Sequence, residues 1–532
     1  MNIENRFCGR RGNLFSACGI FLLSLALYAL ISPGRIDMID GQWRFDVAYS
    51  IFHHGSVALT DPALMERGVP GFDGRRFSPY ALSGSLIATP LIYLSELLAP
   101  ANLDLAQFFF AMTSPLMGAL TLATLYLIYR NLGASSRSAL FWVAVLGFAT
   151  LFLPVSTSIF DQVQNAYFLL ISFYAAHEAK RRNSVGFAVI GAIAFVILIN
   201  FKEAYAVVGP GLVWTAGLNW LRRDFMRQIS DSKVIQLFIL GGLVGIAGFL
   251  AFNLIRFAHP FPPGSLIRPH PPVLGNTAAG LVGLTISPGK GVLWYSPAAL
   301  LVGFGWKTFL RNIPSLAQGI LIASGCWTLL IASLSFYGGD WCWGPRYWVP
   351  LLPLLFLAAP FANWFSRRRR ILAAVTIVLS FSIQCLAVSV DHQRFFFVRE
   401  LPAFFWYKNL TFYYTDSALL ARISELSALE SPAKRKIVGA FRPGPHPESL
   451  TYTIFGRSAE QIVTNQEWLA MYPVFSLPRP WPIWSLAVQD ERIAAARSRA
   501  VTLAALAGIA GLALLFLGSY TVNGRRSATG SL

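Results

Sequence analysis

Apolar and polar positions follow one another along this chain in long blocks. Apolar runs of about 17–25 residues, the length that crosses the hydrocarbon core of a bilayer as a helix, recur through most of the sequence. This pattern predicts an all-α polytopic membrane protein with about 12 transmembrane helices. The predicted spans are residues 14–32, 106–129, 138–154, 163–178, 185–200, 204–220, 234–256, 292–306, 315–336, 347–363, 371–389 and 499–519.

The polar segments between these runs indicate how the spans are oriented. Seven of the segments hold 20 Lys and Arg residues against 4 Asp and Glu residues, and so carry 16 of the 18 net positive charges. They are residues 1–12, 130–137, 178–184, 221–233, 307–314, 364–370 and 520–532. Short loops rich in Lys and Arg mark the cytoplasmic side. We therefore expect both termini in the cytoplasm, and we interpret the basic excess as a topology signal rather than as a nucleic-acid surface.

One apolar stretch, residues 81–99, does not fit this count, because a further crossing would move every later basic loop to the outer side. The stretch contains Pro90 and Glu96, and we expect a surface helix that lies on or dips into the outer face. The alternative is an ordinary span with a misassigned neighbour. The first apolar run lacks a small-residue cleavage site, so we expect a retained helix rather than a removed signal peptide.

The outer segments divide the chain into three parts. Residues 1–390 form the predicted membrane module, with a long first outer loop at 33–105. Residues 391–498 are predicted to form a small extracytoplasmic domain or lid, because their composition is more polar. Residues 499–532 hold a terminal helix and a basic tail.

Composition agrees with a membrane protein. Of the 532 residues, 55% are hydrophobic and 13% are charged, whereas a soluble domain carries about 25% charged residues. The mean hydropathy is +0.54. The five cysteines show no metal-ligand spacing. Cys342 and Cys385 both lie near the predicted outer face, where a disulfide and free thiols are the two alternatives.

The topology is predicted from the basic loops alone. It nevertheless places the ionisable residues of the helix ends together on the outer side. Ionisable groups at membrane depth are costly and mark substrate paths. Carboxylates beside cations suggest a general base next to an anionic ligand; solvated loop charges are the alternative. The outer group comprises Asp37, Asp40, Asp46, Arg75, Arg76, Asp161, Lys202, Glu203, Arg256, His259, Arg268, His270, Lys290, Asp340 and Arg346.

Five stretches of the sequence resemble motifs of the GT-C fold glycosyltransferases, which include the protein O-mannosyltransferase and lipid A aminoarabinose transferase families. They are "DGQWRFDVAYSIFHHGSVAL" at 40–59, "FDQVQN" at 160–165, "NFKEAY" at 200–205, "SPGKGVLWYSP" at 287–297 and "YGGDWCWGPRYWVPLLPLL" at 337–355. Those enzymes move a sugar from a polyprenyl-phosphate carrier to an acceptor outside the cytoplasm. The resemblance implies a GT-C-like bundle with outer juxtamembrane helices and the same kinds of substrate.

The same resemblance implies roles for the acids. Asp40 matches the catalytic base of the first outer loop, with Asp37 and Asp46 as alternatives for that role. Asp161 matches the second acidic site, and Lys202 matches a lysine at the outer end of a later span. The structural alternative for Asp40 is a cap of a surface helix that begins near Trp43, and the alternative for Asp161 is a cap of the following helix.

The cations of the outer group are expected to hold a lipid phosphate, because Arg and Lys stabilise the charge that develops on a departing phosphate. Many relatives carry Lys-Pro-Pro before the surface helix, where this chain has "GRRFSPYALSG". Either Arg75 or Arg76 is therefore expected on the phosphate. The other residues expected around the carrier phosphate and the sugar are Arg256, His259, Arg268, Lys290, Asp340, Arg346 and Tyr347.

Two of these cations have a plain structural alternative. Lys290 stands in "PGKG", which is also an ordinary start of a helix. Arg346 lies among aromatic residues, as interfacial anchors do.

We therefore predict an inverting glycosyltransferase of a multi-pass membrane, such as the bacterial inner membrane, with its active site on the extracytoplasmic face. The donor would be a polyprenyl-phosphate sugar, and the acceptor a glycan, lipid or protein. No cofactor is required, although the acids leave room for a divalent ion such as Mg or Mn. A transporter or flippase of a lipid-linked or anionic substrate is the main alternative, and it predicts charges near mid-span in two related halves. A lipid-modifying ligase or phosphotransferase is a third reading.

Overall fold

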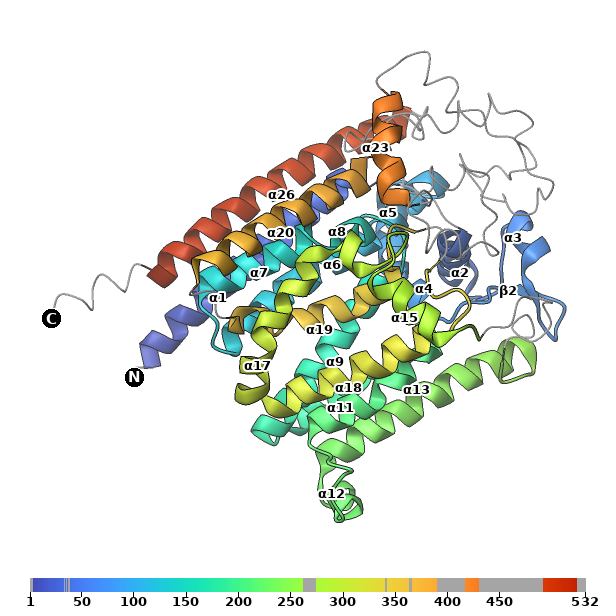
Figure 1. Cartoon of the computed structure of the whole chain (residues 1–532). Coiled ribbons are helices and arrows are strands. Elements are labelled where there is room, and N and C mark those ends of the chain that lie inside the picture. The colour runs from blue at the N-terminus through green and yellow to red at the C-terminus, as the bar shows by residue number, and fades with distance from the viewer. Residues whose placement is uncertain are drawn as a thin grey trace.

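The computed structural model describes residues 3–32, 34, 36, 39–261, 274–339, 342–362, 366–389, 417–429 and 491–523. The predictions for Asp37, Arg268, His270 and Asp340, and for most of the 391–498 segment, lie outside these residues. The described part is almost wholly helical, with its long helices packed side by side in one bundle (Figure 1). The long helices are α1 (Ile3–Ile31), α6 (Thr113–Asn131), α9 (Gln162–Arg182), α10 (Val185–Ile199), α13 (Lys233–Phe257), α18 (Pro314–Ala332), α20 (Arg367–Ser389) and α26 (Glu491–Asn523).

Shorter helices connect and cover the long ones. The α-helices are α2 (Ile39–His54), α3 (Pro62–Arg67), α4 (Ser83–Leu98), α5 (Leu103–Ala111), α7 (Ser136–Phe148), α8 (Phe152–Ser156), α11 (Gly209–Ala216), α12 (Phe225–Asp231), α15 (Thr277–Thr285), α16 (Val292–Tyr295), α17 (Gly303–Asn312), α19 (Leu352–Phe356) and α23 (Ala418–Leu429). The 3-10 helices are η1 (Glu203–Val208), η2 (Pro297–Val302), η3 (Arg346–Leu351) and η4 (Ala359–Phe361). A small antiparallel sheet of β1 (Val69–Pro70) and β2 (Arg76–Phe77) pairs Val69 with Phe77 and Pro70 with Arg76.

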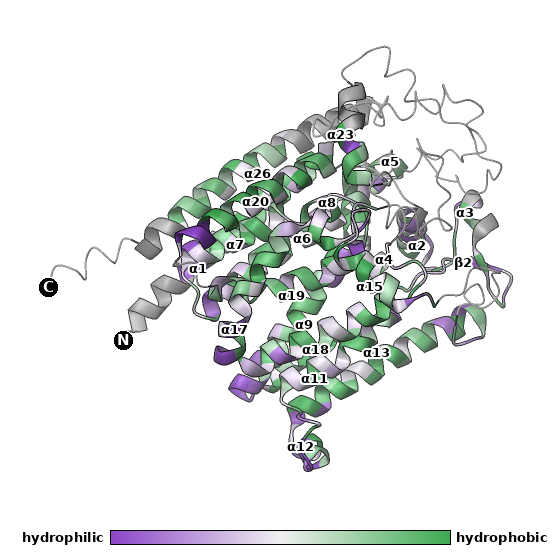
Figure 2. Ribbon diagram, viewed as in Figure 1, coloured by the Kyte–Doolittle hydropathy of each residue, from purple (hydrophilic) through white to green (hydrophobic). Residues whose placement is uncertain are grey.

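The chain is a multi-pass integral membrane protein. Within the described residues, five segments are long and apolar enough to cross a bilayer. They are Arg11–Ile31, Leu105–Asn131, Lys233–Phe257, Pro314–Ala332 and Arg367–Ser389. Figure 2 shows apolar residues along these helices and hydrophilic residues gathered toward the ends of the bundle. Helices also lie at the other predicted spans; the count of about 12 crossings and the cytoplasmic position of both termini stay predictions.

Three predicted spans contain 3-10 helices rather than one continuous α-helix. Residues 204–220 form η1 and then α11, residues 292–306 form α16, η2 and the start of α17, and residues 347–363 form most of η3, then α19 and η4. Proline accompanies each interruption, because it has no N–H to donate and its ring crowds the preceding turn. Pro210, Pro297 and Pro353 stand at the first positions of the new helical segments.

Two contacts identify the end of the bundle that carries the basic residues. The Arg130 Nε donates to Asn13 Oδ1 at 2.9 Å, which ties the end of α6 to the start of α1. Arg181 and Arg182 both pair with Glu178 at the end of α9. At the opposite end Ser114 Oγ donates to the Phe160 carbonyl at 3.1 Å, and this end holds the residues described below.

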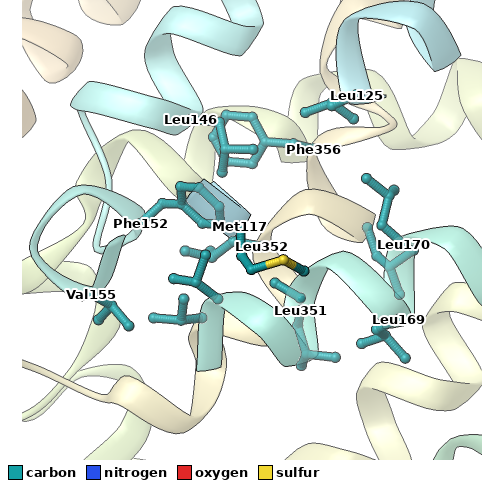
Figure 3. Packing of buried hydrophobic residues seen from close by; sticks show 14 of the residues in the cluster. Met117, Leu125, Leu146, Phe152, Val155, Leu169, Leu170, Leu351, Leu352 and Phe356 are labelled. Carbon is teal, nitrogen blue, oxygen red and sulfur yellow. The ribbon is translucent and has the colours of Figure 1, made fainter. Parts of the chain in front are cut away.

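A buried apolar cluster fixes two segments that are distant in sequence. Leu169 and Leu170 of α9 pack with Leu351 and Leu352 of the η3–α19 segment, together with Met117 of α6 (Figure 3). Because α9 and η3 share this core, the residue before α9 and the first residue of η3 are brought to the same end of the bundle.

Helices α1 and α26 lie against each other along their length through small residues. A Cβ on Gly19 would lie 2.7 Å from the Gly511 carbonyl oxygen, and a Cβ on Gly511 would lie 2.8 Å from the Leu23 nitrogen. Small residues allow this close backbone approach, which is the main source of attraction between helices in lipid.

Candidate active site

Asp40 lies in the first turn of α2, which begins at Ile39. The expected start near Trp43 is therefore wrong by a full turn. An acid in the first turn is favoured by the positive end of the helix dipole, so Asp40 belongs to the helix rather than preceding it. Gly41 lets α2 pack closely against Ile159, which lies just before α9. A Cβ at position 41 would overlap the Ile159 side chain.

The Asp40 carboxylate is half-buried and has contacts from two other segments. The Tyr80 hydroxyl donates to Asp40 Oδ1 at 2.6 Å, and Arg346 Nη1 lies 3.9 Å from Asp40 Oδ2. Tyr80 belongs to the loop before α4, and Arg346 is the first residue of η3. Three segments distant in sequence therefore meet at one carboxylate.

A second acid, Asp161, pairs with Arg44, which lies one helical turn along α2 from Asp40. Arg44 Nη2 pairs with Asp161 Oδ2 at 3.1 Å, and both side chains are buried. Asp161 stands at the N-cap position of α9, but its side chain makes no capping hydrogen bond. It accepts instead from Gln162 Nε2 at 2.8 Å. The pairing favours the site role of Asp161 over the helix-cap alternative.

Arg44 also lines a small cavity of about 10 Å³, which is at the lower limit of the space that holds one water molecule. Asp161, Ser114 and Gln164 line this cavity with Arg44. The Arg44 Nη1 is buried and has no hydrogen-bond partner among the described residues. A buried donor of this kind requires a polar neighbour such as water.

Arg346, which lies beside Asp40, and Lys202 both contact the Tyr347 side chain. The Arg346 guanidinium lies over the Phe160 ring at 4.2 Å from its centroid, and its Nη2 reaches the Tyr347 hydroxyl at 3.5 Å. The Lys202 ammonium lies over the Tyr347 ring at 4.7 Å. Lys202 and Arg346 therefore both contact Tyr347, and Arg346 also lies beside Asp40. Their predicted roles on the substrate stay predictions.

The backbone of η3 is supported from α18. Trp327 Nε1 donates to the Tyr347 carbonyl at 2.8 Å, and the Trp327 ring stacks on Tyr205 with centroids 4.3 Å apart. Both rings are buried. This stack holds the segment that carries Arg346 and Tyr347, and nothing in the sequence pattern signalled it.

Arg256 reaches the site through backbone atoms. At the end of α13, its Nη1 donates to the carbonyls of Ser78 at 2.7 Å and Tyr80 at 3.2 Å. Its Nη2 donates to Asn253 Oδ1 at 2.7 Å. The guanidinium therefore holds the loop that carries Tyr80.

Lys290 is buried near the site and also contacts backbone. Its Nζ donates to the Cys342 carbonyl at 2.7 Å and lies 3.4 Å from the Cys342 Sγ. Cys342 precedes Arg346 by four residues, so Lys290 steadies the turn before η3. Cys342 is a free thiol, as is Cys385, in agreement with the alternative without a disulfide.

Two predicted residues face other partners. Asp46 is buried in α2, and its carboxylate accepts from Thr60 N at 2.7 Å, Thr60 Oγ1 at 2.6 Å and Asp61 N at 3.2 Å. The exposed His259 ring bonds the backbone of Phe261.

The two arginines expected on the carrier phosphate lie at the small sheet. Arg75 is exposed and pairs with Asp73, and Arg76 Nη1 donates to the Gly68 carbonyl at 3.2 Å. Their described contacts lie within the outer loop rather than at Asp40, so their expected role on the phosphate stays a prediction.

Burial and neighbouring charges fix the protonation states of Arg44 and Tyr80, two residues that the sequence analysis did not include in the site. Burial alone lowers the pKa of Arg44, but the carboxylates of Asp161 and Asp40 outweigh it, so that pKa lies above its usual value. Burial, and then the Asp40 charge, raise the pKa of Tyr80 well above its usual value. Arg44 therefore stays charged, and Tyr80 stays a neutral hydrogen-bond donor.

Arg44 and Tyr80 were missing from the predicted site. The spacing of Asp40 and Arg44, four residues apart, places both on one face of a helix, which was a usable signal. Tyr80 had no such signal, because its contact depends on how the loop before α4 folds back. Within the described residues, no group of three or more His, Cys, Asp or Glu side chains gathers as a metal site, and no step below uses a metal.

Comparisons with known proteins add one similarity. No family model and no curated protein matches the chain. Among solved structures, the chain is similar to the crystal structure of ArnT from Cupriavidus metallidurans in the apo state. The match has 13% sequence identity and a TM-score of 0.45, and it covers 94% of this chain and 75% of the other.

Proposed function

We propose that this protein is an integral-membrane inverting glycosyltransferase that moves a sugar from a polyprenyl-phosphate carrier to an acceptor hydroxyl outside the cytoplasm. One observation carries the proposal. The half-buried Asp40 carboxylate lies between a neutral donor, Tyr80, and a cation, Arg346, at the end of the bundle opposite its basic residues.

Asp40 would act as the general base. A carboxylate takes the proton of an attacking hydroxyl as the new bond forms. The acceptor oxygen would then attack the anomeric carbon from the face opposite the phosphate, and the bond from that carbon to the phosphate oxygen would break with its electron pair left on the phosphate. The configuration at the anomeric carbon is inverted in this single displacement.

The cations at Asp40 would hold the departing lipid phosphate. Arg346 and Lys202 flank the Tyr347 ring, and cations placed where charge develops lower the barrier of such a transfer. The charges of Arg44 and Asp161 neutralise each other, so Arg346 and Lys202 would supply the positive field on the side of the Asp40 carboxylate. The Tyr347 ring is available to stack on a sugar.

The position of these groups separates this proposal from a transporter. The four segments that carry them, α2, the start of α9, the start of η1 and the start of η3, place the charges at helix ends. A transporter of a lipid-linked substrate instead requires its binding groups near mid-span, at broken helices of two related halves.

The test is reconstitution of the purified full chain in lipid with a panel of polyprenyl-phosphate sugars and acceptor alcohols. We expect transfer by the unchanged protein and a loss of about 10²- to 10⁴-fold in Asp40→Asn, the usual contribution of a general base. The matched control is Asp73→Asn, which removes an exposed carboxylate of the same outer loop. Full-rate transfer by Asp40→Asn would exclude Asp40 as the base, and lipid movement without sugar transfer would favour a transporter.

A further inference from the structure

We infer that Tyr80 is the positioning residue of Asp40, and that Arg256 acts on the reaction only through Tyr80, by holding the loop that carries it. This inference rests on the proposed function, and it replaces direct phosphate binding as the role of Arg256.

The contact between Tyr80 and Asp40 is short and well enclosed. The hydroxyl donates to Asp40 Oδ1 at 2.6 Å, and a donor to an ionised carboxylate gives one of the stronger hydrogen bonds in proteins. The Arg44 guanidinium lies over the Tyr80 ring at 4.6 Å, and the edge of Trp43 meets it with centroids 6.5 Å apart. The ring therefore has one orientation, which points its hydroxyl at the base.

Tyr80 is placed by its backbone, and Arg256 binds that backbone. The loop before α4 has no helix or strand of its own at residues 78–82. The Arg256 guanidinium donates to two of its carbonyls, those of Ser78 and Tyr80. These two bonds tie the loop to α13 at Tyr80, and the Phe257 ring of α13 also packs on Phe77 just before the loop.

Arg256 is itself fixed in that direction. Its Nη2 bonds Asn253 one turn earlier, and its guanidinium lies over the Phe252 ring at 3.9 Å and the Phe257 ring at 4.5 Å. The side chain is 2% exposed. Nη1 and Nη2 of this guanidinium therefore donate to protein oxygens and its faces lie on rings, while the buried Nε has no hydrogen-bond partner among the described residues.

The charged and titratable groups around Asp40 in the described residues come from four segments, and Lys202 at the start of η1 lies over the neighbouring Tyr347 ring. Tyr80 precedes α4, Arg346 begins η3, and Arg44 lies one turn on in α2 and pairs with Asp161. Removal of the Tyr80 hydroxyl leaves the two arginines in place. The carboxylate then lacks the hydrogen bond from Tyr80, which stabilises its ionised form, and its orientation is less fixed.

The experiment is a double-mutant cycle in the full chain with Tyr80→Phe, Arg256→Gln and the double variant. We expect each single change to lower kcat about 10- to 100-fold, the effect of losing a hydrogen bond to a charged group. KM for the donor should stay within about threefold, and the double variant should be no slower than the slower single variant, because both act on one contact. Arg256→Lys should recover part of the rate, since an ammonium still reaches one carbonyl.

Direct phosphate binding by Arg256 predicts a different cycle. Arg256→Gln would then raise KM for the donor, and its effect would multiply with that of Tyr80→Phe. Either result overturns the inference. Tyr93→Phe on the exposed face of α4 and Arg227→Gln at the exposed pair with Asp231 in α12 are the matched controls, and both should keep the rate of the unchanged protein.

A second readout does not depend on sugar transfer. Dicyclohexylcarbodiimide modifies protonated carboxyl groups, and mass spectrometry of the peptide measures its addition to Asp40. In Tyr80→Phe and Arg256→Gln we expect the pH midpoint of this labelling to move upward, and Arg256→Lys should move it less. No movement in either variant overturns the inference. A shifted pH midpoint of labelling, in a protein that transfers no sugar even when unchanged, would contradict the proposed function. The inference that Tyr80 positions Asp40 would still hold.

Discussion

Arg44 of α2 pairs with Asp161, the residue before α9, at 3.1 Å inside the protein. This pair joins the first outer helix to the bundle at the level of the site. The Arg44 backbone carbonyl also accepts from Ser85 Oγ at 3.0 Å, so α2, α4 and α9 meet at one residue.

The first prediction concerns the stability of this pair. Arg44→Gln leaves a buried carboxylate without its cation, and removal of one partner of a buried pair costs about 3–5 kcal/mol. We expect a clear fall in the thermal unfolding temperature in detergent. Arg44→Gln combined with Asp161→Asn should lose less than the sum of the two single changes. Arg75→Gln, at an exposed pair, should have no measurable effect; an equal fall in both variants would contradict the buried pair.

The second prediction concerns Gly339, which has a φ of +79°. A Cβ at this position would lie 2.7 Å from Arg346 Cγ, and non-glycine residues are disfavoured at this φ. We expect Gly339→Ala to displace Arg346 from Asp40 and to lower transfer by at least about tenfold, the value of 1.4 kcal/mol in the barrier. Gly325→Ala in α18 is the control, because a Cβ there meets no atom within 4 Å. Equal rates in the two variants would contradict the placement of Arg346.

The third prediction concerns pH and Asp46. Burial raises the pKa of this carboxyl, although the bonds from Thr60 and Asp61 act against the rise. A pKa raised in the folded state means that the carboxyl favours folding at low pH, and that this contribution is lost as the pH rises through the folded-state pKa. The unfolding temperature of the unchanged protein, relative to Asp46→Asn, should therefore be higher at pH 4 than at pH 7. A difference that is constant or larger at pH 7 would be the opposite of this result.

The fourth prediction concerns orientation in the membrane. Arg75 and Arg223 are both exposed, in the first outer loop and in the basic segment before α12. Arg75→Cys should react with an impermeant thiol reagent from outside intact cells, whereas Arg223→Cys should react only after the membrane is opened. The unchanged protein controls for its own cysteines. Labelling of both positions from the same side would exclude the predicted topology.

The positions of the helices could be predicted from the sequence because long apolar runs leave few alternatives in a bilayer. The apolar stretch at 81–99 forms the helix α4 (Ser83–Leu98), and its place on the outer face stays a prediction. The interruptions at η1, η2 and η3 could not be predicted, because proline is common in membrane helices and only the surrounding helices decide whether it bends or breaks them.

The site could be predicted only in part. Asp40, Lys202 and Arg346 were grouped because their predicted helix ends share one side; in the structure Arg346 lies beside Asp40, and Lys202 lies over the ring of Tyr347, the neighbour of Arg346. The partners of Arg256 and Lys290 could not be found this way, because both bind backbone carbonyls of loops. Any residue type supplies a carbonyl, so the sequence carries no sign of which one is bound.

The contact of α1 with α26 has a consequence for biogenesis. Membrane chains are inserted in the order in which the ribosome makes them, so α1 enters the lipid before its neighbour exists. The face of α1 that carries Gly19 therefore lacks its partner α26 until almost all other helices have been made, and lipid or an insertion chaperone must cover it until then. A premature stop codon ahead of α26 would therefore leave Asp40 and Arg346 in the product, and yet yield a bundle that cellular proteases recognise as unfinished.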